Sequence, residues 1–444
     1  MIVVIGGGPA GRIASMRLAV AGKEVTLFEL GKIGGQCLHA GCMPVCALND
    51  VARFLNTARR FQDLGIIGSV PVIDFPAALK EMGAVQKKIT SILDHETKEA
   101  GVEIVYGKEA RLEGRNVLVN GENIAAEAVI AATGSRPNIP ECGGLDNEGV
   151  YNPHSIWSIK RLPKRIVIVG GGVMAAEFAY LFHAFGSDVS VICRSGFLKG
   201  LDPHLRKIAL KELSGVTILE NTEICSVDGN KKVRGVTVTS GRSQSAIEAD
   251  SVLLTTGLVP RSEMLNGLRK GPAGEIIVDD HMSTSVKGVY ACGDVTGPPC
   301  LTPVARHQGV VAADNILGKK RKMDYRFIPQ SINLTNELAF CGEAGPKDLK
   351  IAIPGPAGPG TFWSVLSGDT GLAKISADAD TGAISGIACA GPGGGLITGY
   401  MAFLMQKNFS VNEFDNFIEV HPSTDGVYGL AKYASEILRK RNST

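Results

Sequence analysis

The chain opens on Ile2-Val-Val-Ile-Gly-Gly-Gly-Pro-Ala-Gly11, an apolar run that passes directly into a glycine-rich turn. The four apolar residues predict a buried strand, and the glycines predict a sharp turn at its end. A helical pattern then continues to Ala21, and a second strand is expected over Glu24–Phe28. This order of strand, glycine turn, helix and strand is typical of a nucleotide-binding α/β unit.

The same arrangement occurs a second time further along the chain. A strand is expected over Arg165–Val169, a helix to about Phe185 and another strand over Asp188–Ile192. Such glycine turns let the backbone approach a pyrophosphate, which binds the free N–H groups at the helix N-terminus. Because both turns lie between a strand and a helix, we predict two dinucleotide sites. Their key positions are Gly6, Gly8 and Gly11 in the first copy and Gly170, Gly172 and Ala175 in the second.

Length and composition exclude several classes of protein. The 444 residues predict more than one domain, and the net charge of +2 gives no sign of a nucleic-acid partner. No apolar stretch is long enough to span a bilayer, and the N-terminus lacks the basic region and cleavage site of a signal peptide. We therefore expect a cytoplasmic protein that binds neither membrane nor nucleic acid.

The chain has ten cysteines, too few for a disulfide scaffold, but three of them are close together. These are Cys37, Cys42 and Cys46. The spacing of Cys37 and Cys42 allows a disulfide across a helix N-terminus, whose field also lowers a thiol pKa. The same spacing could form half of a metal site. Since no other Cys or His pair has metal-like spacing, we predict no metal.

Taken together, these motifs resemble those of the pyridine nucleotide–disulfide oxidoreductases of the glutathione reductase and lipoamide dehydrogenase type. The resemblance covers essentially the whole chain, in the family's order. The matching segments are Gly6–Gly11 with Glu29, Gly34–Cys42, Ala132–Gly134, Gly170–Ala175, Gly293–Asp294, Leu301–Ala305 and His421–Pro422.

The resemblance implies an α/β fold with two Rossmann-like domains, one for FAD and one for NAD(P), and a C-terminal α+β dimerisation domain. We expect the FAD domain over residues 1–145 and 261–322, the NAD(P) domain over 146–260 and the dimerisation domain over 323–444. The last domain should contain a helix near Leu396–Lys407 and another from about Val427.

The resemblance also implies roles for individual residues. Cys42 would be the thiol beside the flavin and Cys37 the thiol that attacks the substrate. His421 would be the general base that deprotonates Cys37, supplied by the other subunit of a homodimer. FAD would be bound through Glu29, Thr133, Gly134 and Asp294, with Glu29 accepting hydrogen bonds from the adenosine ribose.

The end of the second strand in the second copy predicts the nicotinamide cofactor. Cys193 stands where the first copy has Glu29, and Arg194 and Lys199 follow it. A carboxylate at this position would repel a 2′-phosphate, whereas a guanidinium and an ammonium attract it. We therefore predict NADPH rather than NADH.

The sequence departs from the family pattern at two catalytic positions. Gly426 stands where a glutamate usually orients the histidine, and Asp425 is the candidate replacement. Cys46 stands where a lysine usually pairs with a glutamate that is retained here as Glu177. Burial of Glu177 without that cation would raise its pKa or require another donor. Cys46 itself is either a small apolar filler or a third redox thiol.

These observations predict an FAD-dependent enzyme that passes electrons from NADPH through the Cys37–Cys42 pair to a small-molecule or protein disulfide. One alternative is a dihydrolipoamide dehydrogenase, which normally uses NAD. A mercuric reductase is disfavoured because no cysteine follows Cys389. A degenerate flavoprotein that acts as a redox sensor or complex subunit is a third alternative.

Overall fold

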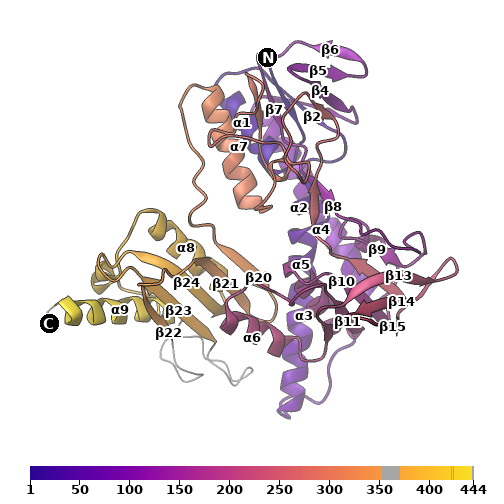
Figure 1. The fold of residues 1–444 in the computed structure, drawn as a ribbon, viewed down its shortest axis with the longest axis vertical. Coiled ribbons are helices and arrows are strands. Elements are labelled where there is room, and N and C mark those ends of the chain that lie inside the picture. Colours follow the sequence, from indigo (N-terminus) through magenta and orange to yellow (C-terminus); the bar gives the residue numbers. More distant parts are fainter. Residues whose placement is uncertain (353–370, 422, 424, 443–444) are drawn as a thin grey trace. The chain divides into compact units, whose positions relative to one another are not determined.

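The computed structural model describes residues 1–352, 371–421, 423 and 425–442. They form two compact units (Figure 1). The first unit combines Met1–Ala47, Asp74–Arg161 and Val252–Asp324, and the second combines Leu48–Ile73, Leu162–Ser251 and Tyr325–Thr444. Each unit contains parallel strands, one of which leads through a glycine turn into a helix. This arrangement confirms the α/β class.

The first unit is built on a five-stranded parallel sheet. Its strand order is β19 (Val289–Ala291), β7 (Ala128–Ala131), β1 (Ile2–Ile5), β2 (Val25–Glu29) and β3 (Val102–Tyr106). All four residues of β1 are buried, as their apolar side chains require of a central strand. Helix α1 (Pro9–Val20) packs against this sheet and lies side by side with α7 (Thr302–Ile316) (Figure 1).

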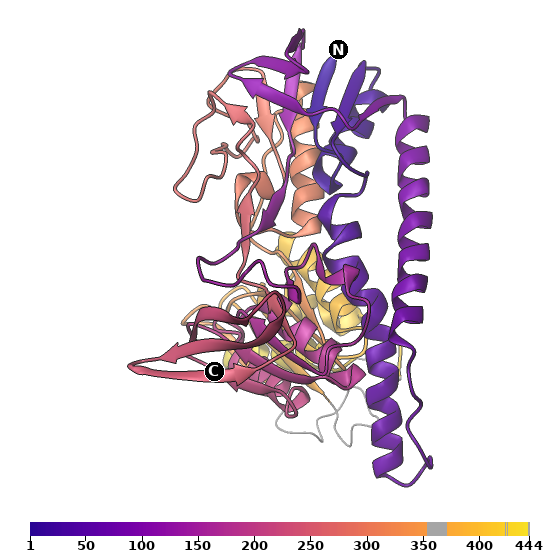
Figure 2. The same cartoon turned by 90° about the vertical axis from the view of Figure 1, so that its right-hand side faces the viewer.

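The other elements of the first unit are one long helix and several short helices and strands. Helix α4 (Phe75–Glu99) is a long unbroken helix, whose N-cap Asp74 accepts a hydrogen bond from the N–H of Ala77 (Figure 2). The shorter elements are α2 (Gly35–His39), β4 (Ala110–Glu113), β5 (Asn116–Val119), β6 (Glu122–Ile124), β8 (Ser135–Pro137), β9 (Val150–Tyr151), η1 (Ile156–Ser158), β16 (Ser251–Leu254), β17 (Leu258–Pro260), β18 (Leu265–Asn266) and η2 (Asp294–Thr296).

The second unit contains the repeat of the strand–turn–helix arrangement. Strand β10 (Arg165–Val169) leads through the second glycine turn into α5 (Val173–Phe185), which ends at Gly186 in the left-handed conformation. Strand β10 pairs in parallel with β11 (Asp188–Ile192), which pairs with β12 (Thr217–Leu219). The complete strand order of this sheet is β12, β11, β10, β16 and β9. The unit also contains α6 (Pro203–Glu212) and an antiparallel sheet of β13 (Glu223–Gly229), β14 (Val233–Ser240) and β15 (Ser243–Glu248).

The C-terminal part of the second unit is a five-stranded antiparallel sheet covered by helices. The strand order is β20 (Gln330–Asn333), β21 (Glu337–Gly342), β24 (Ile384–Gly391), β23 (Leu372–Ala377) and β22 (Leu349–Ala352). Helices α8 (Gly394–Gln406) and α9 (Gly426–Asn442) and the turn η3 (Val411–Asn416) pack on it around a shared apolar core. The two helices match those predicted near Leu396 and from Val427.

One long helix was not predicted from the sequence. Helix α3 (Cys42–Asp63) begins at the second cysteine of the pair and continues from the first unit into the second. Cys42 and Cys46 therefore lie about one turn apart on the same helix. Among the described helices, none combines the length and apolar character needed to cross a membrane.

Candidate active site

The first glycine turn has the shape that a bound pyrophosphate requires. Gly6 has a φ of +106°, and a Cβ on it would lie 2.3 Å from the carbonyl oxygen of Ala132. A Cβ on Gly11 would lie 2.0 Å from the carbonyl oxygen of Gly6. Gly8 is the N-cap of α1, so no side chain covers the first N–H groups of the helix at that position. These residues fit the phosphates of FAD.

Glu29 lies beside this turn at the end of β2. Its two carboxylate oxygens accept hydrogen bonds from the N–H groups of Gly7 and Gly31, both at 2.7 Å. Each oxygen keeps a further lone pair, so the carboxylate can also accept from a ribose hydroxyl. The turn and the acceptor predicted from the sequence are therefore adjacent in the fold.

The two cysteines of the predicted redox pair lie on consecutive helices. Cys37 lies in α2, and Cys42 is the first residue of α3. The hydrogen bond from Cys42, assisted by Thr302 and the nearby Arg306, lowers the pKa of Cys37 to about 6, although burial and Asp294 act in the opposite direction. A thiol with this pKa is mostly thiolate at neutral pH, which is the nucleophilic form.

A polar cluster that was not predicted surrounds Asp294, next to the cysteines. One carboxylate oxygen of Asp294 accepts hydrogen bonds from the side chains of Gln36 and Ser135, each at 2.7 Å. The ring Nε2 of His154 lies 3.1 Å from the side-chain oxygen of Gln36. Since Gln36 immediately precedes Cys37, this cluster fixes the helix that carries the Cys37 thiol.

Thr133 and Gly134, the other predicted FAD contacts in the first unit, form a sharp turn after β7. The hydroxyl of Thr133 donates to the carbonyl oxygen of Arg261 at 2.5 Å, and the N–H of Arg261 donates to the carbonyl oxygen of Gly134 at 2.9 Å. Gly134 has a φ of +73°, a conformation that favours glycine. The segment is thus joined to Arg261, the residue that follows β17.

The second glycine turn repeats the first but ends differently. Gly172 is the N-cap of α5, and Ala175 is fully buried against the strand. Cys193 is also buried, its thiol donates to the carbonyl oxygen of Ser195 at 2.9 Å, and burial raises its pKa. Arg194 and Lys199 are exposed at the two ends of the following loop.

Glu177 on α5 has the partner that its burial requires. Its carboxylate accepts hydrogen bonds from the backbone N–H of Asn333 at 2.9 Å and from the Asn333 side chain at 3.2 Å. Burial raises the pKa of Glu177, while these bonds and the charge of Arg53 oppose the shift. Asn333 and Arg53 belong to the same unit as Glu177 and were not singled out from the sequence.

His421 lies next to its predicted orienting residue. Its Nδ1 is 2.7 Å from a carboxylate oxygen of Asp425, which is only 7% exposed. The His421 side chain itself is 75% exposed. Pro422, which follows it in the family motif, lies outside the described residues. A buried carboxylate that fixes one ring nitrogen leaves the other available for proton transfer.

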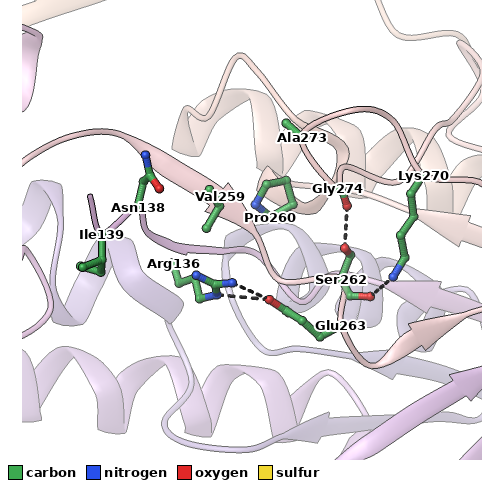
Figure 3. Close-up of a pocket in the computed structure, with 10 residues that line it drawn as sticks. All are labelled: Arg136, Asn138, Ile139, Val259, Pro260, Ser262, Glu263, Lys270, Ala273 and Gly274. Atoms are coloured by element: carbon green, nitrogen blue, oxygen red, sulfur yellow. Dashed lines mark hydrogen bonds and ion pairs between the residues drawn. The ribbon is translucent and has the colours of Figure 1, made fainter. Parts of the chain in front are cut away.

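A separate cavity of about 480 Å³ lies on the β8–β17 side of the first unit (Figure 3). The charged side chains that line it form hydrogen bonds with other lining residues. Arg136 pairs with Glu263, and Lys270 donates to the carbonyl oxygen of Ser262. We assign no role to this cavity.

The comparisons with known proteins agree with this geometry. Residues 1–309 match the family model described as pyridine nucleotide-disulphide oxidoreductase. The chain is 31% identical to the dihydrolipoyl dehydrogenase of Thermus scotoductus, with 99% of this chain and 97% of that protein covered. It is 29% identical to the mercuric reductase of Staphylococcus aureus, with 76% and 63% covered.

Among solved structures, the chain resembles the HOCl-induced flavoprotein disulfide reductase RclA from Escherichia coli in its Cu(II) complex. The TM-score is 0.83 at 23% identity, and 99% of each chain is covered, so this likeness concerns the fold. The family match extends over more than half of the chain and includes both glycine turns and the cysteine pair. The chain therefore belongs to the pyridine nucleotide-disulphide oxidoreductase family and is an FAD-dependent oxidoreductase of that family.

Proposed function

We propose that this protein is an NADPH-dependent disulfide reductase in which Cys37 is the nucleophile. The observation that carries the proposal is the position of Cys37 beside the second thiol of Cys42, whose hydrogen bond lowers the pKa of Cys37 to about 6. A mostly ionised thiol next to a resolving thiol is the arrangement that thiol–disulfide exchange requires.

When bound, FAD supplies the two-electron link between the nicotinamide and the cysteine pair. The Cys37 thiolate attacks one sulfur of the substrate disulfide, and the first substrate thiolate leaves. The Cys42 thiolate then attacks Cys37, which forms the Cys37–Cys42 disulfide and releases the second substrate thiolate. His421, fixed by Asp425, is the proposed acid–base group for the leaving thiols.

We propose the remaining cofactor contacts from their positions around the two turns. Gly6, Gly8, Gly11, Glu29, Thr133, Gly134 and Asp294 would hold FAD, and Gly170, Gly172 and Ala175 would hold the pyrophosphate of the nicotinamide cofactor. The exposed Arg194 and Lys199 support NADPH, because a guanidinium and an ammonium both attract a 2′-phosphate.

We also propose a homodimer formed through the C-terminal part of the chain. Two apolar residues beside His421 are strongly exposed, Ile418 at 92% and Val420 at 77%. Leu396 on α8 is 82% exposed. Exposed apolar groups of this size favour burial at an interface, which would also bring His421 to the partner subunit. The ten cysteines are too few for a disulfide scaffold, which suits a reducing compartment, and we propose that the protein is cytoplasmic.

Dihydrolipoyl dehydrogenase activity is the second candidate, because relatives at 29–31% identity carry that name. The position of Cys193 favours the first candidate. Steady-state turnover of the FAD-loaded dimer, with NADPH or NADH and a panel of disulfides that includes lipoamide, separates the two. The proposal predicts turnover with NADPH that is lost in Cys37→Ser. Fast turnover of lipoamide with NADH would establish the second candidate instead.

A further inference from the structure

The loop that follows β11 is fixed at its centre, between the exposed residues Arg194 and Lys199. Phe197 is fully buried and anchors the loop in the second unit. The N–H of Leu198 donates to the carbonyl oxygen of Gly171 in the glycine turn at 2.7 Å. The loop is therefore attached to the turn where the cofactor's pyrophosphate is proposed to bind.

Two charged side chains bind both polar groups of the Phe197 backbone. The carboxylate of Glu220, just after β12, accepts the Phe197 N–H at 2.7 Å. The guanidinium of Arg206, on α6, donates through Nε to the Phe197 carbonyl oxygen at 2.8 Å. Arg206 also donates through its Nη2 to Glu220 at 2.6 Å. The three contacts close a ring of hydrogen bonds around one peptide segment, which we call the Phe197 clamp.

We propose that Glu220 and Arg206 are positioning residues for NADPH, which hold the loop so that Arg194 and Lys199 are preorganised for the 2′-phosphate. This inference rests on the proposed use of NADPH. Ordering two long cationic side chains and their loop costs conformational entropy on binding, and a loop already held in place reduces that cost.

Electrostatics alone predicts the opposite effect for Glu220, which makes the inference testable. A carboxylate near a phosphate site repels the phosphate, so its removal should strengthen NADPH binding if only charge matters. The clamp requires the carboxylate as an acceptor, so its removal should weaken NADPH binding. For Arg206, replacement by lysine keeps the charge but loses the planar fork that contacts Phe197 and Glu220 together.

The experiment measures the dissociation constants of NADPH, NADH and 2′,5′-ADP for the FAD-loaded protein and for Glu220→Ala and Arg206→Lys. Lys207→Met is the matched control, because Lys207 is an exposed cation beside Arg206 on α6. We expect both clamp variants to bind NADPH and 2′,5′-ADP about tenfold more weakly, as for one charge-assisted hydrogen bond. NADH binding and the control should change little.

Amide hydrogen exchange provides a second readout that does not depend on the cofactor. The Phe197 amide should exchange faster in Glu220→Ala, because its acceptor is gone, and unchanged exchange would contradict the clamp. Tighter NADPH binding by Glu220→Ala, with Arg206→Lys equal to the unaltered protein, would overturn the inference while leaving the proposed function intact. If the unaltered protein binds NADH at least as tightly as NADPH, the cofactor proposal itself fails, and the specificity role fails with it.

Discussion

The two glycine turns share one scaffold but differ at the residue that would face the ribose. In the first, the carbonyl oxygen of Gly7 accepts a hydrogen bond from Gly34; in the second, that of Gly171 accepts one from Leu198. Beside this common scaffold, Glu29 presents a carboxylate, whereas Cys193 is a buried thiol followed by an exposed arginine. In our proposal, this repeated scaffold binds pyrophosphate twice, and one position in each copy selects the rest of the ligand.

The largest effect is expected where the carboxylate is removed from the first turn. Glu29→Leu should lose FAD, because it removes the ribose acceptor and leaves the N–H groups of Gly7 and Gly31 without their partner. A loss of about 1.5–3 kcal/mol per charged hydrogen bond corresponds to at least tenfold weaker FAD binding. The measurement is bound FAD per chain after dialysis. Cys193→Ser, the matched change in the second turn, should keep its FAD, and equal loss from both variants would contradict the division of roles.

The converse substitution introduces the first turn's carboxylate into the second. Cys193→Glu should weaken NADPH by about 1–3 kcal/mol, because a buried carboxylate beside the loop repels the 2′-phosphate. NADH should be used as well as before or better. The ratio of kcat/KM for the two cofactors measures this effect directly. An unchanged ratio would mean that the end of β11 does not select the cofactor.

The smallest effect concerns Glu177, a buried carboxylate on the helix that follows the second turn. Because burial raises its pKa, the folded state holds the proton more tightly than the unfolded chain does. Its ionisation therefore reduces stability as the pH rises from the usual glutamate range through the raised pKa. Glu177→Gln keeps an oxygen for Asn333 and should remove this loss. Thermal unfolding of both proteins between pH 4 and about pH 8 tests it, and parallel curves would refute it.

The sequence predicted the two turns and their strands well because glycine turns are local patterns. Strand β10 and helix α5 end where they were expected, and β2 is shifted by one residue, to Val25–Glu29. Helix α3 was not predicted, for two reasons. Its first turn contains Pro44, and the cysteine segment before it has no clear helical period. The contact between His421 and Asp425 could be predicted because the two residues are only four positions apart in the chain.

The contacts that were missed join residues far apart in the sequence. Gln36 meets Asp294 only because β19 lies in the same sheet as β1. Asn333 contacts Glu177 from strand β20 of the C-terminal sheet. Glutamine and asparagine carry no motif of their own, so spacing along the chain could not reveal these partners. The predicted domain boundaries likewise depend on long-range packing and stay a prediction.

The central claim is that Cys37 is the reactive thiol of an NADPH-reduced cysteine pair. The most direct test is the rate of alkylation of each cysteine by iodoacetamide, mapped by peptide mass, before and after anaerobic reduction of the FAD-loaded enzyme with NADPH. The account predicts that Cys37 becomes the fastest-reacting thiol after reduction, and that its alkylation rate is half-maximal at pH about 6. Replacement of Cys42 by alanine should raise this midpoint pH, because the hydrogen bond from Cys42 is lost. Faster labelling of another cysteine, or a Cys37 midpoint near the ordinary thiol pKa, would contradict it.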